Sequence, residues 1–361
     1  MLPELTRSQK YALDYITNYA RSHKAEADET IHHILRMSNI SMDLYEKAVG
    51  SLKANARIGL HFHPDRPVSD MKSVAKALLD QGMYKSQFET FISNGSVSAL
   101  PGGERDVWEN KLFGGAYQLE GTTTDQRPKY GALHVMLHPD GPAPRFGSCY
   151  FLLSPKASHR STFTYLDSHQ DPKEKGTYEA FDPILSALLE EVFSRDSAIG
   201  EANLTPSKLM KHLSKNLDKP LPDPAKKAPK RNLNHYIEAQ VHGQISLKDD
   251  VEVLVADPSF KEKKIGHVMN DICRKYSIDL YWHSGFSLSP EEVPSDFRGT
   301  AMPSLAERIA VNNRINASVI GSAVMDLHRN PQDWLDRGSF KEVLQELKLL
   351  WHVLVKYGKA Y

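Results

Sequence analysis

The sequence predicts an α+β protein in which a β-rich centre lies between two helical ends. Apolar residues recur at helical spacing in residues 1–55 and again in 291–361. Between them, short apolar runs alternate with polar residues and are separated by Gly, Pro, Asp and Ser, as is typical of strands and turns. The 361 residues are 40% hydrophobic and 25% charged, so the composition is that of a globular protein with a substantial core.

Helical spacing characterises both ends of the chain. In residues 1–55 the spaced apolar positions are Tyr11, Leu13, Ile16 and Tyr19, followed by Ile31, Ile34 and Leu35. Residues 291–361 contain predicted helices at 305–327 and 340–357. The last helix carries an apolar stripe wide enough to be buried, made of Val343, Leu344, Leu347, Leu350 and Leu354.

Residues 56–290 are predicted to form an α+β catalytic core. Its expected strands are 57–62, 130–137, 146–153, 161–165, 236–242, 251–256 and 278–283, and its expected helices are 73–79, 106–117, 178–193 and 260–276. The segment at about 203–233 is rich in Lys and Pro. We expect it to be a solvated connector that does not pack as a core element, so that the core straddles it.

Charge and cysteine content limit the classes of function. Lys and Arg total 45, as do Asp and Glu, so the overall charge favours neither a nucleic-acid nor a membrane partner. Cys149 and Cys273 are too few for a disulfide framework. No secretory signal and no membrane-spanning apolar run is visible. We therefore expect a cytoplasmic protein, or one secreted into a host cell by a dedicated secretion system.

The most informative strand is predicted at 236–242, because alternate side chains leave a strand on opposite faces. Ile237, Ala239 and Val241 then share one face and are expected to be buried. The other face carries four groups able to form hydrogen bonds and to line a cleft, namely Tyr236, Glu238, Gln240 and His242. The alternative is a polar, solvent-facing side of an edge strand.

The strand predicted at 57–62 has a second alternating pattern, which extends from Ile58 to His63 and ends in a turn. Its polar face carries His61 and His63, and Pro64 prevents the strand from continuing. Asp65 and Arg66 are therefore expected in the turn just beyond it. An arginine in such a turn binds a phosphate through its planar guanidinium, or forms a structural salt bridge with an acid such as Asp65.

Several phrases together resemble one family. They are LHFHPDR at 60–66, SQFET at 86–90, RPKYGAL at 127–133, PRFGSCY at 144–150, TFT at 162–164 and EAQVHG at 238–243. In this order they resemble a bacterial family known only as a domain of unknown function, which we associate with the ADP-ribosyltransferase superfamily. The phrases extend over more than half of the chain.

This resemblance implies a split, bent β-core that clamps NAD, with an arginine, a strand serine and a glutamate in that order. Arg66, Ser161 and Glu238 satisfy the order. The implied function is NAD-dependent transfer of ADP-ribose to a protein side chain, arginine in some members, some of which are effectors or toxins. Glu238 is expected to stabilise positive charge on the ribose, with Ser161 holding the carboxylate and Gln240 as an auxiliary hydrogen-bonding group. The residues expected to bind NAD are Arg66, His61, His63, Gln87, Asn94, Thr164, Tyr236 and His242.

The sequence departs from the superfamily pattern in its last motif. Arginine-directed members are expected to carry Glu-x-Glu or Gln-x-Glu with the catalytic glutamate second, whereas this chain has Glu238-x-Gln240. Ser148 is an alternative to Ser161 as the middle residue. Two other functions stay open: a metal-dependent hydrolase that uses His61-x-His63 with His134, His138, His242 and Asp257, and a non-catalytic binding protein on the same scaffold.

Overall fold

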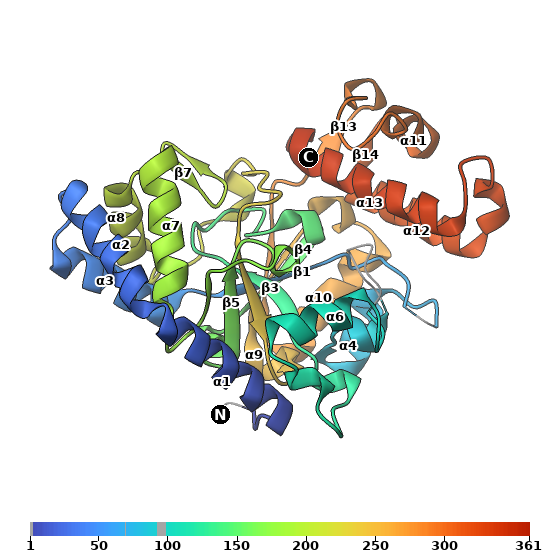
Figure 1. Ribbon diagram of the computed structural model, residues 1–361. Coiled ribbons are helices and arrows are strands. Elements are labelled where there is room, and N and C mark those ends of the chain that lie inside the picture. The colour runs from blue at the N-terminus through green and yellow to red at the C-terminus, as the bar shows by residue number, and fades with distance from the viewer. Residues whose placement is uncertain (1–2, 69, 92–98) are drawn as a thin grey trace.

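A computed structural model describes residues 3–68, 70–91 and 99–361 and shows an eight-stranded sheet at the centre of the molecule (Figure 1). All neighbouring strands run antiparallel except the parallel pair β11 and β12. From one edge to the other the strands are β12 (Asp279–Trp282), β11 (Val251–Ala256), β4 (Cys149–Leu153), β1 (Ile58–Phe62), β3 (Lys129–Leu133), β9 (Ile237–Val241), β5 (Ser161–Tyr165) and β6 (Lys175–Thr177). Strand prediction is therefore confirmed at every expected place, although two strands are shorter than expected by three or more residues at one end and three others by one residue at one or both ends.

The two shortened strands have local causes. The strand expected at 130–137 ends at Leu133, because Leu137 adopts the left-handed conformation (φ 54°) and Pro139 follows it. The strand expected at 146–153 begins at Cys149, because Pro144–Phe146 forms a 3-10 turn, η3. The remaining 3-10 turns are η1 (Ala116–Gln118), η2 (Thr124–Gln126), η4 (Pro155–Arg160), η5 (Ser168–Gln170), η6 (Pro224–Lys226), η7 (Pro258–Phe260), η8 (Pro290–Glu292) and η9 (Pro331–Trp334).

The N-terminal segment is helical, as predicted. It forms α1 (Arg7–Ser22), α2 (Lys24–Met37) and α3 (Met42–Asn55). The side chain of Thr6 caps the first of these helices and that of Ser41 the third. Helix α2 packs against α7 (Asp182–Arg195), α3 packs against α8 (Pro206–Asn216), and α1 lies along β6 (Figure 1). Helices α2 and α3 are thus part of the main hydrophobic core, whereas α1 packs in a separate cluster with Leu112, Phe113 and Tyr117.

The first half of the Lys- and Pro-rich segment at 203–233 packs into the core, so the prediction of a solvated connector is wrong there, whereas residues 218–230 are mostly exposed. This first half forms α8, in which Leu209, Met210 and Leu213 are fully buried while the lysines face solvent. Thr205 caps this helix, and Pro206 occupies its first turn. The amides of Lys230 and Arg231 donate to the buried carboxylate of Asp140. Proline here starts a helix, and the lysine charges mask its amphipathic pattern.

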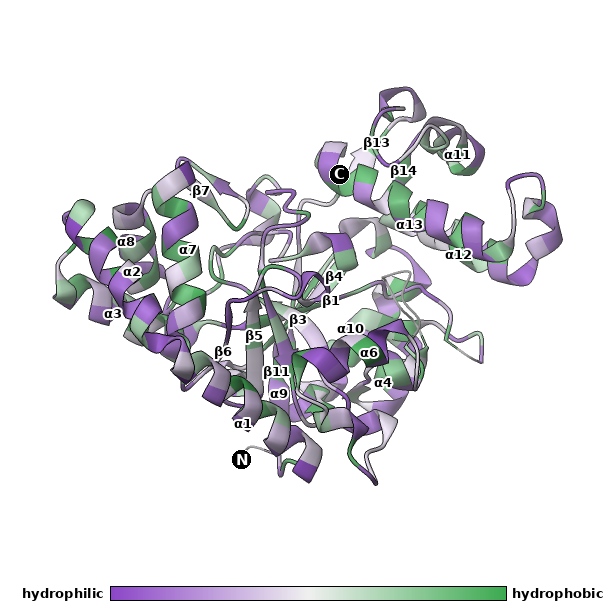
Figure 2. Cartoon of the chain, viewed as in Figure 1, coloured by the Kyte–Doolittle hydropathy of each residue, from purple (hydrophilic) through white to green (hydrophobic). Residues whose placement is uncertain are grey.

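Shorter elements surround one side of the sheet. The helices are α4 (Val74–Gln81), α5 (Gln87–Thr90), α6 (Glu104–Leu112), α9 (Leu247–Asp250) and α10 (Lys264–Tyr276). Three two-stranded sheets pair β2 (Met83–Tyr84) with β10 (Ile245–Ser246), β7 (Ser197–Ala198) with β8 (Glu201–Ala202), and β13 (Ser287–Leu288) with β14 (Ile315–Asn316). Figure 2 shows hydrophobic and hydrophilic residues interleaved along α7 and α13, as expected of helices with one buried face.

The C-terminal segment forms α11 (Met302–Ile309), α12 (Ala317–Arg329) and α13 (Phe340–Tyr357), at the opposite end of the molecule from α2 and α3 (Figure 1). The single helix expected at 305–327 is in fact two. Asn312 and Asn313 both take the left-handed conformation, and the Asn316 side chain then caps α12. The indole of Trp351 on α13 donates to the carbonyl of Pro144 at 2.9 Å, which joins this segment to the core.

The two faces of the sheet differ in chemistry. One face, with Leu60, Phe163 and Ile237, belongs to the main hydrophobic core. On the other face Thr164 pairs with Glu238 and Thr162 with Gln240, so polar side chains lie side by side. Strand β1 pairs with β4 over four positions but with β3 only at Ile58 and Gly59. Beyond Gly59 no pairing joins β1 to β3, so the sheet is open there among the described residues.

Candidate functional site

A cavity of about 310 Å³ lies where β1 and β3 are no longer paired. Its walls include Phe62 from β1 and Tyr130 and Gly131 from β3, while α4, α5 and α6 enclose the remaining side. The lining is partly apolar, with charged groups from several elements. A concave, partly apolar volume with convergent polar groups is the form of most small-molecule sites, which measure about 300–1,000 Å³.

Glu238 lies in the wall of this cavity, as the alternation of β9 predicts. Its side chain is 5% exposed. Ser168 Oγ donates to Oε1 at 2.5 Å, and Gln240 Nε2 donates to the same oxygen at 2.8 Å. Burial, together with the nearby carboxylate of Asp167, raises the pKa of Glu238 to about 7, against the lowering effect of these hydrogen bonds and of Arg105.

Ser168, and not Ser161, holds this carboxylate. Ser161 pairs with Val241 on the apolar face of the sheet, and its hydroxyl donates to the carbonyl of Ala157 at 2.8 Å. The expected role of Ser161 is therefore corrected, because a side chain on the opposite face cannot reach Glu238. Ser148, the alternative, is buried, and its Oγ has no hydrogen-bond partner among the described residues. Sequence reasoning missed Ser168 because it lies beyond β5, in η5.

Arg66 lines the same cavity as Glu238, as expected. Its nearest acid is Asp65, with Nη1 3.6 Å from Oδ1, too long for a good hydrogen bond. Within the described part of the chain Nη1 is buried without a hydrogen-bond partner. The guanidinium is therefore held near the cavity by burial rather than by a strong salt bridge, and it remains available to an anionic ligand.

Arg105 is a second cavity arginine, which sequence reasoning missed. Its guanidinium stacks on Trp108, 4.4 Å from the ring centroid, and lies 5.0 Å from that of Tyr130. The side chain is 5% exposed and close enough to lower the pKa of Glu238. Across the described residues no carboxylate pairs with Arg105, and its Nε has no hydrogen-bond partner. A buried cation of this kind is a natural partner for a ligand anion.

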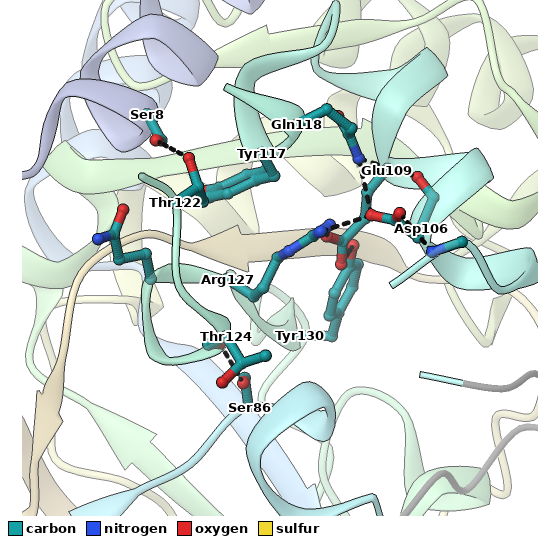
Figure 3. A network of polar contacts seen from close by, with 12 residues as sticks. Ser8, Ser86, Asp106, Glu109, Tyr117, Gln118, Thr122, Thr124, Arg127 and Tyr130 are labelled. Carbon is teal, nitrogen blue, oxygen red and sulfur yellow. Dashed lines mark hydrogen bonds and ion pairs between the residues drawn. The ribbon is translucent and has the colours of Figure 1, made fainter. Parts of the chain in front are cut away.

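Arg127 explains why Arg105 is left without an acid. Figure 3 shows the Arg127 guanidinium directed at Asp106 and Glu109 of α6. It donates to Glu109 at 2.8 Å and to Asp106 at 2.5 Å, while the hydroxyl of Tyr130 donates to Glu109 at 2.9 Å. These carboxylates neutralise Arg127 and fix the ring of Tyr130. The same helix therefore presents Arg105 to the cavity without a salt bridge to any carboxylate in the described ranges.

Aromatic rings line the cavity, but Tyr236 is not among them. Its hydroxyl donates to Asp167 at 2.9 Å, and its ring packs edge-on against Phe146 at 5.7 Å. The expectation that Tyr236 stacks on a ligand is therefore corrected. The rings that do line the cavity are Phe62, Tyr84, Trp108, Tyr130 and Phe146.

His61 and His63 both line the cavity, but His61 is already saturated. The amide of Ala143 donates to Nε2 at 3.2 Å, so Nδ1 carries the proton and donates to the carbonyl of Gly147 at 3.1 Å. Burial lowers the pKa of His61 to about 3, which keeps the ring neutral. His63 packs edge-on against Trp351, 5.1 Å between ring centroids. His61 therefore holds the loop that carries Arg145 in place, and neither of its ring nitrogens is free to contact a ligand.

The remaining expected ligand-binding residues have different locations. Gln87 lines the cavity at the start of α5, and its Oε1 is buried without a partner among the described residues. Thr164 donates to the carbonyl of Leu166 at 3.0 Å. His242 is fully buried between Tyr117 and Thr162, at 2.5 and 3.1 Å. Neither Thr164 nor His242 lines the cavity. Asn94 lies outside the residues that the structure describes.

Gln240 does not line the cavity, yet it is coupled to Glu238. It accepts a hydrogen bond from Thr162 at 2.7 Å and donates to Glu238. Both ends of its amide are thus used, and its orientation is fixed. This is the auxiliary hydrogen-bonding position expected for the second residue of the Glu-x-Gln pair.

The histidines proposed for a metal site do not come together. His134 bonds to the carbonyl of His138, and His138 bonds to Glu201 at 3.0 Å. Over residues 3–68, 70–91 and 99–361 no group of three or more His, Cys, Asp or Glu is arranged to hold a metal ion. Because both nitrogens of His61 are already bonded, this ring has no free ligand atom for a metal.

Two basic residues reach the cavity from beyond the sheet. Arg145, on the loop after β3, donates to Asn234 at 2.8 Å and lies 3.4 Å from Asp167. Lys348 comes from α13 of the C-terminal segment. Sequence reasoning missed both. Arg145 lies within the phrase PRFGSCY, but nothing local to α13 indicates that Lys348 faces a cavity.

Together, fold and site define an α+β protein with a large cavity. Basic side chains and one buried glutamate, Glu238, line this cavity. Residues 57–357 match the model of a family described as "Protein of unknown function (DUF3626)", so the chain belongs to this family. The match confirms the expected membership in a family of unknown function. The matched residues include helix α13, which carries Lys348. No curated protein matches the chain. Within the described ranges, none of the helices has the length and apolar character needed to cross a membrane.

Proposed function

We propose that the cavity binds NAD and that the protein transfers ADP-ribose from it to an acceptor side chain on a protein. The observation that supports this most is a juxtaposition. The Glu238 carboxylate, held by Ser168 and Gln240, shares one cavity with Arg66 and Arg105, two arginines without strong acidic partners. A carboxylate near cations that are free to bind a pyrophosphate matches the nicotinamide ribose of NAD and the pyrophosphate next to it.

The chemistry of NAD fits these groups. Cleavage breaks the bond between ribose C1′ and the nicotinamide nitrogen, which leaves with the electron pair, while the acceptor gives a lone pair to C1′ and loses its proton. Positive charge develops on the ribose, and a fixed carboxylate stabilises it. Glu238 supplies that carboxylate. Arg66 and Arg105 supply planar donors for phosphate oxygens, and Trp108 and Tyr130 offer flat surfaces.

The hydrogen bonds to Glu238 have a defined purpose under this proposal. Burial alone favours the protonated form, which cannot stabilise a cation. Ser168 and Gln240 both donate to Oε1 and so favour the charged form. We expect NAD cleavage to increase as the pH rises through about 7, the pKa of Glu238.

The test is release of nicotinamide from NAD by the purified full chain, with labelled NAD and a cell lysate to find the modified protein and residue. We expect Glu238→Gln to lower the rate by about 10²–10³-fold, the usual loss for a group that stabilises transition-state charge. Arg66→Ala is expected to weaken NAD binding. The matched control is Glu120→Gln, which removes an exposed carboxylate outside the cavity.

Three outcomes are decisive. Loss of cleavage in Glu238→Gln with NAD still bound and the fold intact supports the proposal. Equal cleavage by the wild type and Glu238→Gln contradicts the role of this residue. Tight NAD binding without any cleavage by the wild type would replace the transferase by the non-catalytic binding protein considered above.

A further inference from the structure

Three cations cluster beside the proposed reaction site. Arg145 and Lys348 line the cavity, and Arg298 is close enough to Lys348 for its charge to contribute to lowering the pKa of that amine. His352 lies on the next turn of α13 after Lys348. Its pKa is lowered by burial and then by the charges of all three cations. Burial and the neighbouring Arg145 and Arg298 lower the pKa of Lys348 to about 8. Like charges gathered in a half-buried place repel one another, so this arrangement is costly unless an anion is bound.

The cluster is poorly neutralised by the protein itself. Asp167 is 3.4 Å from Arg145, but it also accepts a hydrogen bond from Tyr236. No carboxylate pairs with Lys348 or Arg298 in the portion of the chain that the structure describes. The Nε atoms of Arg145 and Arg298 are likewise buried without hydrogen-bond partners. These unpartnered donors are available to an acceptor on a ligand.

The place of the cluster indicates which ligand it serves. Arg145 contacts Asp167, and the next residue, Ser168, holds Glu238. The cluster is therefore adjacent to the carboxylate at which the proposed transfer takes place. Arg66 and Arg105 already provide donors for the NAD pyrophosphate, so a third set of cations remains for the other substrate.

The charge of the whole cavity excludes a basic acceptor on electrostatic grounds. Among the described residues its lining contains two acidic side chains, Asp167 and Glu238. It contains six basic ones, namely Arg66, Lys85, Arg105, Lys129, Arg145 and Lys348. An arginine side chain would approach an excess of positive charge, whereas an anionic acceptor would be attracted. The balanced charge of the whole chain, 45 basic against 45 acidic residues, favours recognition of one phosphate group over a nucleic-acid backbone.

We propose that Arg145, Arg298 and Lys348 form a subsite for a phosphate monoester, and that the acceptor is a phosphorylated protein segment held there by its phosphate. This inference rests on the proposed transferase function for the meaning of the subsite, but not for the binding of phosphate. The phosphate is not altered. It positions a neighbouring nucleophile of the same acceptor against the ribose.

The first experiment measures binding of inorganic phosphate, and then of a phosphoserine peptide, to the full-length protein without NAD by calorimetry. We expect Lys348→Gln to weaken binding of both at least tenfold and Arg298→Gln to weaken it less. Lys341→Gln is the matched control, since Lys341 is exposed on the same helix and outside the cavity. The unphosphorylated peptide should not bind. Equal phosphate affinity in Lys348→Gln and the wild type would overturn the subsite.

A second measurement separates this proposal from the proposed function. Nicotinamide release by the wild type without acceptor reports on NAD cleavage alone. If cleavage occurs but phosphate binding does not depend on Lys348, the subsite is wrong and the transferase is not. If phosphate binds through Lys348 but NAD is not cleaved, the transferase is wrong. Lys348-dependent preference for NADP over NAD would place the subsite at the cofactor instead of the acceptor, and binding of a 5′-phosphorylated oligonucleotide but not of the phosphopeptide would overturn the assignment to a protein acceptor.

Discussion

Strands β1 and β9 carry the same alternating pattern but differ in what their polar side chains do. On β1, both nitrogens of His61 are bonded to the backbone of Ala143 and Gly147. On β9, the carboxylate of Glu238 is bonded through side chains of Ser168 and Gln240 and still faces the cavity. A buried polar side chain whose donors and acceptors are all bonded to the backbone stabilises the fold. One that keeps a free acceptor at a cavity can bind a ligand.

Burial acts on the two residues with opposite consequences for pH. It lowers the pKa of His61 to about 3 and raises that of Glu238 to about 7, because in both cases the neutral form is favoured. His61 therefore stabilises the fold above its ordinary pKa of 6.5, and that stability is lost as the pH falls toward 3. For Glu238 the contribution is present below 4.5 and is lost as the pH rises through about 7.

The largest effect on stability is expected from His61→Ala. This change leaves the amide of Ala143 and the carbonyl of Gly147 without their partner and opens a cavity, so we expect a loss of about 3–4 kcal/mol in the free energy of unfolding at pH 7.5. Urea denaturation measures it. His32→Ala, an exposed histidine on α2, is the control and should change stability by less than about 0.5 kcal/mol. Similar losses in both variants would show that the hydrogen bonds of His61 do not stabilise the fold.

A smaller effect, of opposite sign, is expected from Glu238→Gln. At pH 8.5 the wild type keeps a charged carboxylate buried, and the neutral amide avoids that cost, so the variant should be more stable by about 2 kcal/mol. At pH 4.5 the wild-type carboxyl is also neutral, and the gain should vanish. Urea denaturation at both pH values checks this. A variant that is less stable than the wild type at pH 8.5 would mean that Glu238 is a structural residue like His61.

The smallest effect is expected from Ser168→Ala, which tests the positioning of the carboxylate. The hydroxyl of Ser168 favours the charged form of Glu238, so its removal should raise the pKa of Glu238 by about one unit above its value of about 7. The ¹³C chemical shift of the labelled carboxyl group, followed through a pH titration, reports this pKa. Ser161→Ala is the matched control, because that hydroxyl lies on the opposite face of the sheet. Equal pKa values in both variants would remove Ser168 from the site.

Local patterns predicted most of the elements but few of the partners of the site residues. Helix α13 and strands β5 and β11 lie at their predicted residues, because the spacing of apolar residues a few positions apart indicates which face is buried. Helix α8, within the segment at 203–233, was not predicted, because the lysines and prolines of that segment obscure the helical spacing of its buried residues. The helix expected at 305–327 was divided by Asn312 and Asn313, whose backbone conformation outweighs their weak helical preference.

The sequence alone determined that Glu238 and Gln240 share one face of β9, because the side-chain period of a strand is a local property. Only the tertiary structure decided that Ser168 holds the carboxylate of Glu238 and that Asp106 and Glu109 pair with Arg127 and not with Arg105. It also decided that Lys348 reaches the cavity from the far end of the chain. These outcomes depend on competition between partners separated by many residues, and no local pattern records which partner wins.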